Sequence, residues 1–143
     1  MGAQENTRLV QDYMQAVRDR DEEKMSGFLA EDAVIRVAGV PRALGGVTQG
    51  RDQILQNFRE GGPQGESELQ NIFADDDNVC TVQKVHNLMS GTQHFRGNDN
   101  PYATYQSAVF KVAGGRIQEQ TLYINFLDVY VQSGLVQLNS LRA

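Results

Sequence analysis

The sequence is poor in the residues that build disulfides and metal centres. Its 143 residues include one cysteine, Cys80, and two histidines, His86 and His94. A single cysteine cannot form a disulfide within the chain, and no Cys/His cluster has the spacing of a zinc site. We therefore expect a fold that is stable without a disulfide and contains no metal centre.

Runs of basic or apolar residues are also missing. The net charge is −5 and no lysines or arginines cluster, so the chain lacks the concentrated positive charge of a nucleic-acid-binding groove. No apolar stretch approaches a membrane span, and the first residues lack the apolar segment of a secretory signal. The glycine-rich segment 39–50 has no phosphate-binding pattern, which argues against a nucleotide cofactor. We expect a cytoplasmic protein with no cofactor and with neither nucleic acid nor membrane as partner.

What is present is typical of a globular chain with a helical first part. Apolar residues make up 40% and charged residues 22%, which predicts one folded domain over residues 1–143. Apolar residues recur at helical spacing in 9–17, and shorter helices are predicted from Asp21 and over 51–60. Asn6 or Thr7 is the expected cap of the first helix.

Strand patterns dominate the rest of the sequence. A β-branched run covers 33–37, and further strands are expected at 66–73, 79–88, 102–112 and 116–126. A turn at 75–78, a loop at 91–100 and the Gly114-Gly115 pair separate the last four. Three helices followed by a meander of antiparallel strands predict the α+β class.

Several sequence motifs occur together in the order seen in one superfamily. They are AEDAV at 30–34, GRDQI at 50–54, VFKV at 109–112 and GRI at 115–117. With the first helix and the tail after Tyr123, the chain resembles the nuclear transport factor 2-like superfamily over roughly 7–135. Within that superfamily, the chain resembles the SnoaL-like, ketosteroid isomerase and limonene epoxide hydrolase members. The resemblance implies a cone-shaped, curved mixed or antiparallel β-sheet with three N-terminal helices enclosing a pocket.

The resemblance also assigns positions in that pocket. Tyr13 matches the tyrosine of ketosteroid isomerases, but Val37 and Thr104 stand where their two aspartates are. Leu122 stands where SnoaL-like cyclases and epoxide hydrolases place an acid on the last strand. Lys84 and His86 match an arginine–aspartate pair of the epoxide hydrolases. Three acid positions of the family therefore carry residues that do not ionise.

His86, Lys84 and Tyr13 are the candidate catalytic residues. Strand alternation puts Lys84 and His86 on one face, and if that face lines the cavity, the imidazole can transfer protons near neutral pH. Lys84 can then hold an oxyanion, and the Tyr13 phenol can stabilise one. The alternatives are that His86 bonds a backbone group or a partner subunit and that Tyr13 is a core aromatic.

Neutral groups on the last two strands are the candidate substrate contacts, because a small-molecule site is mostly apolar with a few polar groups. Together with the three substituted acid positions and the apolar Ile124, they form the set Val37, Thr104, Gln106, Gln120, Leu122 and Ile124. A one-residue error in register would turn the strand members outward. Asp32 is assigned to a turn, Asp128 to the start of a tail helix, and His94 with Arg96 to a solvent-facing loop.

Two functions remain open from the sequence. The first is a cofactor-independent enzyme acting on a small apolar, secondary-metabolite-like molecule by isomerisation, cyclisation or hydration-type chemistry. The second is a non-catalytic ligand-binding or assembly module of the same fold. Tyr105, Tyr123 and Phe126 are expected on the outer sheet face, where they favour a homodimer joined through the sheet.

Overall fold

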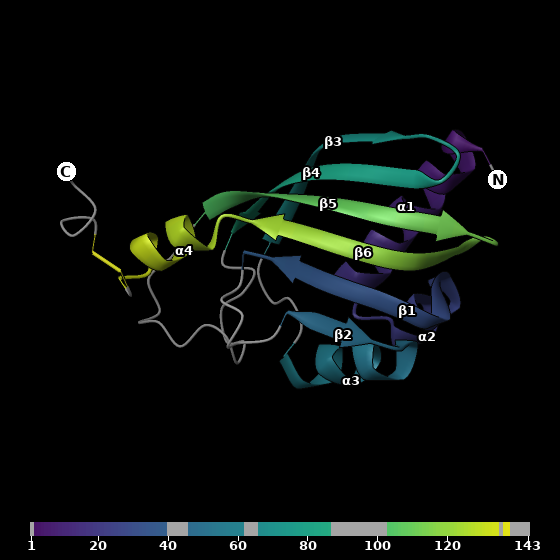
Figure 1. Ribbon diagram of the computed structural model, residues 1–143, viewed down its shortest axis with the longest axis horizontal. Helices are drawn as coiled ribbons and strands as arrows, with labels where there is room; N and C mark the ends of the chain where they lie inside the picture. The colour runs from purple at the N-terminus through teal and green to yellow at the C-terminus, as the bar shows by residue number, and fades with distance from the viewer. Residues whose placement is uncertain (1, 40–45, 62–65, 87–102, 135, 138–143) are drawn as a thin grey trace.

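The computed structural model describes residues 2–39, 46–61, 66–86, 103–134 and 136–137. Within these ranges, four helices and six strands follow one another along the chain, and Figure 1 labels them. The helices are α1 (Ala3–Arg18), α2 (Glu22–Phe28), α3 (Arg51–Gly61) and α4 (Phe126–Gln132). The strands are β1 (Leu29–Ala38), β2 (Val47–Gln49), β3 (Glu66–Ala74), β4 (Asn78–His86), β5 (Ala103–Ala113) and β6 (Arg116–Ile124).

The six strands form one mixed sheet in the order β2-β1-β6-β5-β4-β3. Strands β3 to β6 form the antiparallel meander that the sequence predicts, and Gly114 and Gly115 supply the positive φ angles of the β5–β6 turn. Strand β1 runs parallel to β6, which makes the sheet mixed. The expected α+β class with a curved sheet is confirmed. Strand β2 lies in a segment that we expected to be a loop.

Helix α1 is amphipathic and begins earlier than its sequence suggests. Leu9, Val10 and Tyr13 are buried on its inner side. The helix starts at Ala3, so the expectation that Asn6 or Thr7 caps it is wrong. Asn6 is instead fully buried, and its amide donates a hydrogen bond of 2.9 Å to the backbone carbonyl of Asp76 in the β3–β4 turn. Its side chain therefore ties the helix to the sheet.

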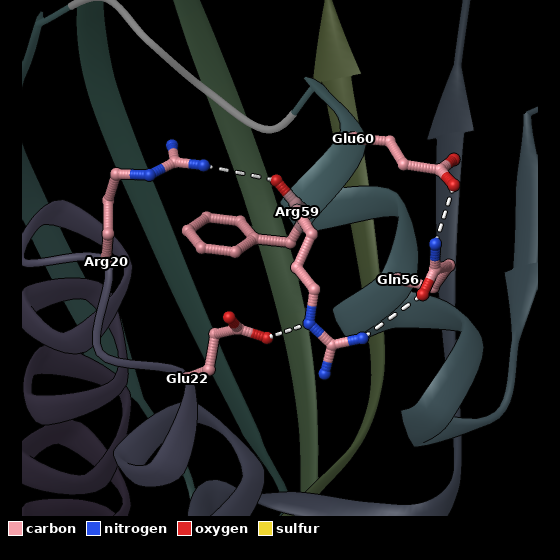
Figure 2. A network of polar contacts seen from close by, with 6 residues as sticks. Arg20, Glu22, Gln56, Arg59 and Glu60 are labelled. Atoms are coloured by element: carbon pink, nitrogen blue, oxygen red, sulfur yellow. Dashed lines mark hydrogen bonds and ion pairs between the residues drawn. The ribbon is translucent and has the colours of Figure 1, made fainter.

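The junction between α1 and α2 is joined to α3 by the polar network in Figure 2. The Arg20 guanidinium lies 4.4 Å from the ring centroid of Phe58 and donates to the Phe58 carbonyl over 3.3 Å. Arg59 pairs with Glu22 at the start of α2. Because the Arg59–Glu22 pair is about half exposed to solvent, it adds little to stability and mainly orients the helices.

Helices α1, α2 and α3 cover one face of the sheet, which we call the inner face; the opposite side is the outer face. Burial alternates along β4, where Val79, Thr81, Gln83 and Val85 are buried and their neighbours are not. The main core is built from this face and from the helices, for example Val10, Leu55 and Phe110. Alternation therefore assigns each residue of β4 to either the inner or the outer face.

Helix α4 packs on the end of the sheet where β1 and β6 finish (Figure 1). Phe126 is 4% exposed and packs with Val129 and Ile124, so its expected place on the outer face is wrong. Asn125 caps the helix, and Asp128 lies in its first turn as expected. The Gln132 amide accepts from the backbone N–H of Ala103 (2.9 Å) and donates to its carbonyl (2.8 Å). The helix is thereby held to the start of β5.

Candidate functional site

A pair of buried amides lies on the inner face, on the neighbouring strands β4 and β5. Gln83 on β4 and Gln106 on β5 are directly opposite each other, because the two strands are antiparallel in that register. The Nε2 atom of Gln106 donates to Oε1 of Gln83 over 3.2 Å. Both side chains are at least nine-tenths buried. In the described part of the chain, Oε1 of Gln106 has no hydrogen-bond partner.

Two threonines on the same face extend this polar cluster. Thr104 precedes Gln106 by two residues on β5 and is 7% exposed. Thr81 lies two residues from Gln83 on β4 and is fully buried. Among the described residues, its hydroxyl also has no hydrogen-bond partner. Buried polar atoms in native proteins are nearly always paired, so these two oxygens on neighbouring strands can take a hydrogen-bond partner from outside the chain, either a water molecule or a ligand.

Tyr13 reaches the inner face from helix α1. Its ring packs edge-to-face on Phe110 of β5, with ring centroids 6.3 Å apart and an interplanar angle of 77°. Burial raises the pKa of the Tyr13 phenol well above its usual range, because removal from water disfavours the phenolate. The phenol therefore stays protonated and can serve as a hydrogen-bond donor.

The six predicted substrate contacts share the inner face. In the β5–β6 register, Gln106 is opposite Ile124, Ala108 opposite Leu122, and Phe110 opposite Gln120. Val37 lies beside Leu122 across the parallel β1–β6 pair, and Thr104 has the same alternation as Gln106. Val37 and Ile124 also contact the small apolar cluster of α4. The structure thus brings these residues to one side of one sheet.

Lys84 and His86 lie on the other side. They alternate with the buried pair Gln83 and Val85, and their cross-strand partners are Tyr105 and Ala103. The expectation that the Lys84–His86 face lines the interior is therefore not met. The physical reason is that the core lies on the Val79–Val85 side of β4, where α1 packs. We missed Gln83 and Thr81, although their shared spacing with Val79 and Val85 was a usable signal.

The remaining candidate residues are outside the inner face or outside the described residues. Asp32 is exposed and lines a shallow outer groove of about 390 Å³ with Arg36, Lys111 and Glu119. His94 and Arg96 lie outside the described residues. Within the described ranges, no three His, Cys, Asp or Glu side chains are grouped so that they could hold a metal ion. No helix of the described segments is long and apolar enough to span a membrane.

The outer face carries exposed aromatic side chains. Phe73 on β3 is 56% exposed, Tyr105 on β5 is 62% exposed, and Tyr123 on β6 is 51% exposed. Val109 also belongs to this face, since it alternates with buried Ala108 and Phe110. The expected outward position of Tyr105 and Tyr123 agrees with this alternation.

Solved structures with the same fold come from proteins of several described activities. An epoxide hydrolase of M. tuberculosis, described as resembling limonene epoxide hydrolase, has a TM-score of 0.73 and 21% identity over 98% of each chain. A candidate SnoaL-like polyketide cyclase from Jannaschia sp. CCS1 has a TM-score of 0.78 and 14% identity over 94% of each chain. A candidate polyketide cyclase from Xanthomonas campestris pv. campestris is 26% identical, with a TM-score of 0.68, over 93% of this chain and 99% of its own.

The sequence also matches a family model directly. No curated protein matches the chain. The SnoaL-like domain model matches residues 10–120, from the first turns of α1 to the middle of β6. This match includes Tyr13, the amide pair, strands β1 to β5 and the first part of β6. The chain therefore belongs to the SnoaL-like family, and it shares its fold with an NTF2-like protein of Burkholderia xenovorans (TM-score 0.74, 18% identity, over 93% of this chain and 98% of that chain).

Proposed function

We propose that the chain binds a small, largely apolar molecule on the inner face of its sheet and converts it without a cofactor. The conversion is an isomerisation, a cyclisation or a hydration-type reaction. The observation that carries the proposal is the buried Gln83–Gln106 pair, whose Oε1 acceptor on Gln106 is unpartnered among the described residues. A few polar groups in an apolar setting are typical of a small-molecule site.

Tyr13 supplies the hydrogen-bond donor in this proposal. Its pKa is raised by burial, so the phenol is neutral throughout the physiological pH range. A neutral donor in a water-poor site stabilises negative charge that develops on a substrate oxygen. Gln83 and Gln106 orient the substrate. Val37, Leu122 and Ile124 contribute apolar contacts, while Thr104 and Gln120 add neutral polar groups.

A second candidate is non-catalytic binding of the same kind of molecule. It is favoured by Val37, Thr104 and Leu122, which occupy the positions where the resembled enzymes carry acids. Lys84 and His86, the titratable pair proposed from the sequence, lie on the outer face and so do not replace those acids. Both candidates use the same binding site and differ in whether the ligand is converted.

The experiment compares two variants that each remove one tyrosine hydroxyl, one on the inner side of the sheet and one on the outer face. Small apolar molecules are first screened by thermal shift, because a ligand that binds only the native state raises the melting temperature. Ligands found in this way are incubated with wild type, Tyr13→Phe and the outer-face control Tyr105→Phe, and their conversion is followed by mass spectrometry. We expect Tyr13→Phe to lower the rate by about 10²–10³, the usual effect of removing one such donor, and Tyr105→Phe to have no effect.

The same experiment separates the two candidates. Binding without conversion by any of the three proteins would support the binding module and end the catalytic proposal. Conversion with equal rates in wild type and Tyr13→Phe would remove Tyr13 from the chemistry. A screen in which no ligand raises the melting temperature would oppose both candidates.

We also propose that two copies of the chain pair through the outer face. Tyr105 and Tyr123 are each more than half exposed on the neighbouring strands β5 and β6, and Phe73 is more than half exposed on β3, two strands from β5. Large exposed apolar patches mark interfaces. Tyr123→Asp would place a charge inside such an interface and should raise the dimer dissociation constant at least about tenfold. Leu127→Asp is the control, since Leu127 is also about half exposed but belongs to helix α4 and not to the sheet. Light scattering that finds wild type monomeric at micromolar concentration would contradict the dimer.

A further inference from the structure

Two oxygen atoms of the inner face are buried without a hydrogen-bond partner in the described part of the chain. They are Oε1 of Gln106 and Oγ1 of Thr81. Burying such an atom without a partner destabilises the folded protein. A group that supplies the missing partner is therefore favoured at this position over one that does not.

The register places these two atoms on adjacent strands. Thr81 is opposite Ala108, and Gln83 is opposite Gln106, so Thr81 and Gln106 are diagonal neighbours. Diagonal neighbours on one face are about 7–8 Å apart at the backbone, within reach of a long side chain. Ala108, which is opposite Thr81 and two residues from Gln106, is buried and carries only a methyl group on this face.

The hydrogen bond between the two side-chain amides decides which kind of partner is missing. The Nε2 atom of Gln106 is already engaged with Gln83, so the free function of Gln106 is its acceptor oxygen. A threonine hydroxyl can both donate and accept. A ligand hydroxyl fits both groups, since its hydrogen can go to Gln106 while its oxygen accepts from Thr81.

Other oxygen groups fit less well. An ether or a ketone has no hydrogen to donate, and it would leave the Gln106 oxygen unpartnered. A carboxylate would bring negative charge against an acceptor oxygen, and burying an unpaired charge is costly. The cation Lys84 cannot compensate, because it alternates with Gln83 and lies on the outer face.

We infer that the ligand of the inner face is a neutral alcohol or phenol whose hydroxyl donates a hydrogen bond to Oε1 of Gln106. This inference rests on the proposed function, because it assumes a small molecule at that site. It makes Gln106 a specificity-determining residue that distinguishes hydroxyl compounds from their ethers and acids.

The test uses three naphthalene compounds that differ in one substituent. The full-length protein is titrated at pH 7 with 2-naphthol, 2-methoxynaphthalene and 2-naphthoate by isothermal titration calorimetry. We expect 2-naphthol to bind roughly fivefold tighter than the ether, the ratio that one net hydrogen bond produces. We expect no measurable binding of the carboxylate.

Two variants test whether the preference for 2-naphthol over its methyl ether depends on Gln106. Gln106→Leu should bring the affinity for 2-naphthol down to that for 2-methoxynaphthalene. Ser107→Ala, at the next position of β5 and on the outer face, should keep the wild-type ratio. If Gln106→Leu does not fold, the ratio measured on wild type still decides the inference.

The outcomes separate this inference from the proposed function. Ether binding as tight as naphthol binding, or tightest binding of the carboxylate, would overturn the inference and leave a small-molecule site in place. A fivefold preference that persists in Gln106→Leu would also overturn it. Failure of all three compounds to bind would overturn both the inference and the proposed function.

Discussion

The two faces of the sheet are built from the same strands but differ in what they bury. On β5, Gln106 is 6% exposed while its neighbour Tyr105 is 62% exposed. Glutamine is usually a surface residue and tyrosine is usually at least half buried. This part of the strand therefore reverses the usual placement of polar and aromatic side chains.

The reversal does not extend over the whole strand. Further along β5, Phe110 is 1% exposed and Val109 is 36% exposed, the arrangement expected of a core strand. The part of the inner face around Phe110 is therefore packed as an apolar core, while the part that carries the amide pair buries polar side chains. Local departures from the packing rules are expected where a protein is functional.

If the two faces differ as described, the largest loss of stability is expected on substitution of Phe110. Phe110→Ala should lower the free energy of unfolding by about 3–5 kcal/mol, because it leaves a cavity in the core beside Tyr13. Val109→Ala, on the same strand but on the outer face, should cost less than about 1.5 kcal/mol. Urea unfolding of both variants measures the difference. Equal losses would mean that the two faces are not distinct in the way described.

The next effect is a pH dependence that belongs to the inner face alone. An unfolded tyrosine loses its proton near pH 10, whereas burial holds the pKa of Tyr13 higher in the folded protein. Above about pH 10 the folded state therefore binds more protons than the unfolded state, and stability falls as pH rises.

Removing the phenol tests this directly. The contribution of Tyr13 to the slope approaches about 1.4 kcal/mol per pH unit at most. Wild type should lose stability between pH 10 and 11.5 more steeply than Tyr13→Phe, as followed by urea unfolding. Tyr105→Phe, exposed on the outer face, should keep the wild-type slope. Parallel curves for wild type and Tyr13→Phe would contradict the buried, neutral phenol.

A smaller effect is expected at the amide pair. The double variant Gln83→Leu/Gln106→Leu removes both amides and the unpartnered oxygen together, which is close to neutral or stabilising. Its melting temperature should equal or exceed that of wild type, while the affinity for 2-naphthol falls. A large loss of stability in the double variant would show that the pair serves the fold.

The smallest effect is expected at His86. His86→Gln keeps a similar volume and hydrogen-bonding ability on the outer face. We expect unchanged affinity for inner-face ligands and an unchanged conversion rate. A fall of about 10² or more in rate would restore His86 as the acid–base group that the sequence suggested.

Much of the fold was predictable because hydrophobic periodicity is a local property. The helices over 9–17 and 51–60 and the four strands of the meander follow from spacing alone, with ends displaced by a few residues. The short strand β2 was not predictable, since its three residues form a strand only by pairing with β1. The start of α1 was also missed, because Asn6 bonds the distant β3–β4 turn instead of capping the helix.

The sequence by itself determined the alternation of each strand, and therefore which residues of a strand lie on the same face of the sheet. Thr104 with Gln106, and Lys84 with His86, share a face in any structure that contains these strands. Only the tertiary structure decided which face is inner, because the side on which α1 packs is set by contacts between distant segments. On β4 both faces mix polar and apolar side chains, so periodicity could not distinguish them, and the packing of the helices turned Gln83 inward and His86 outward.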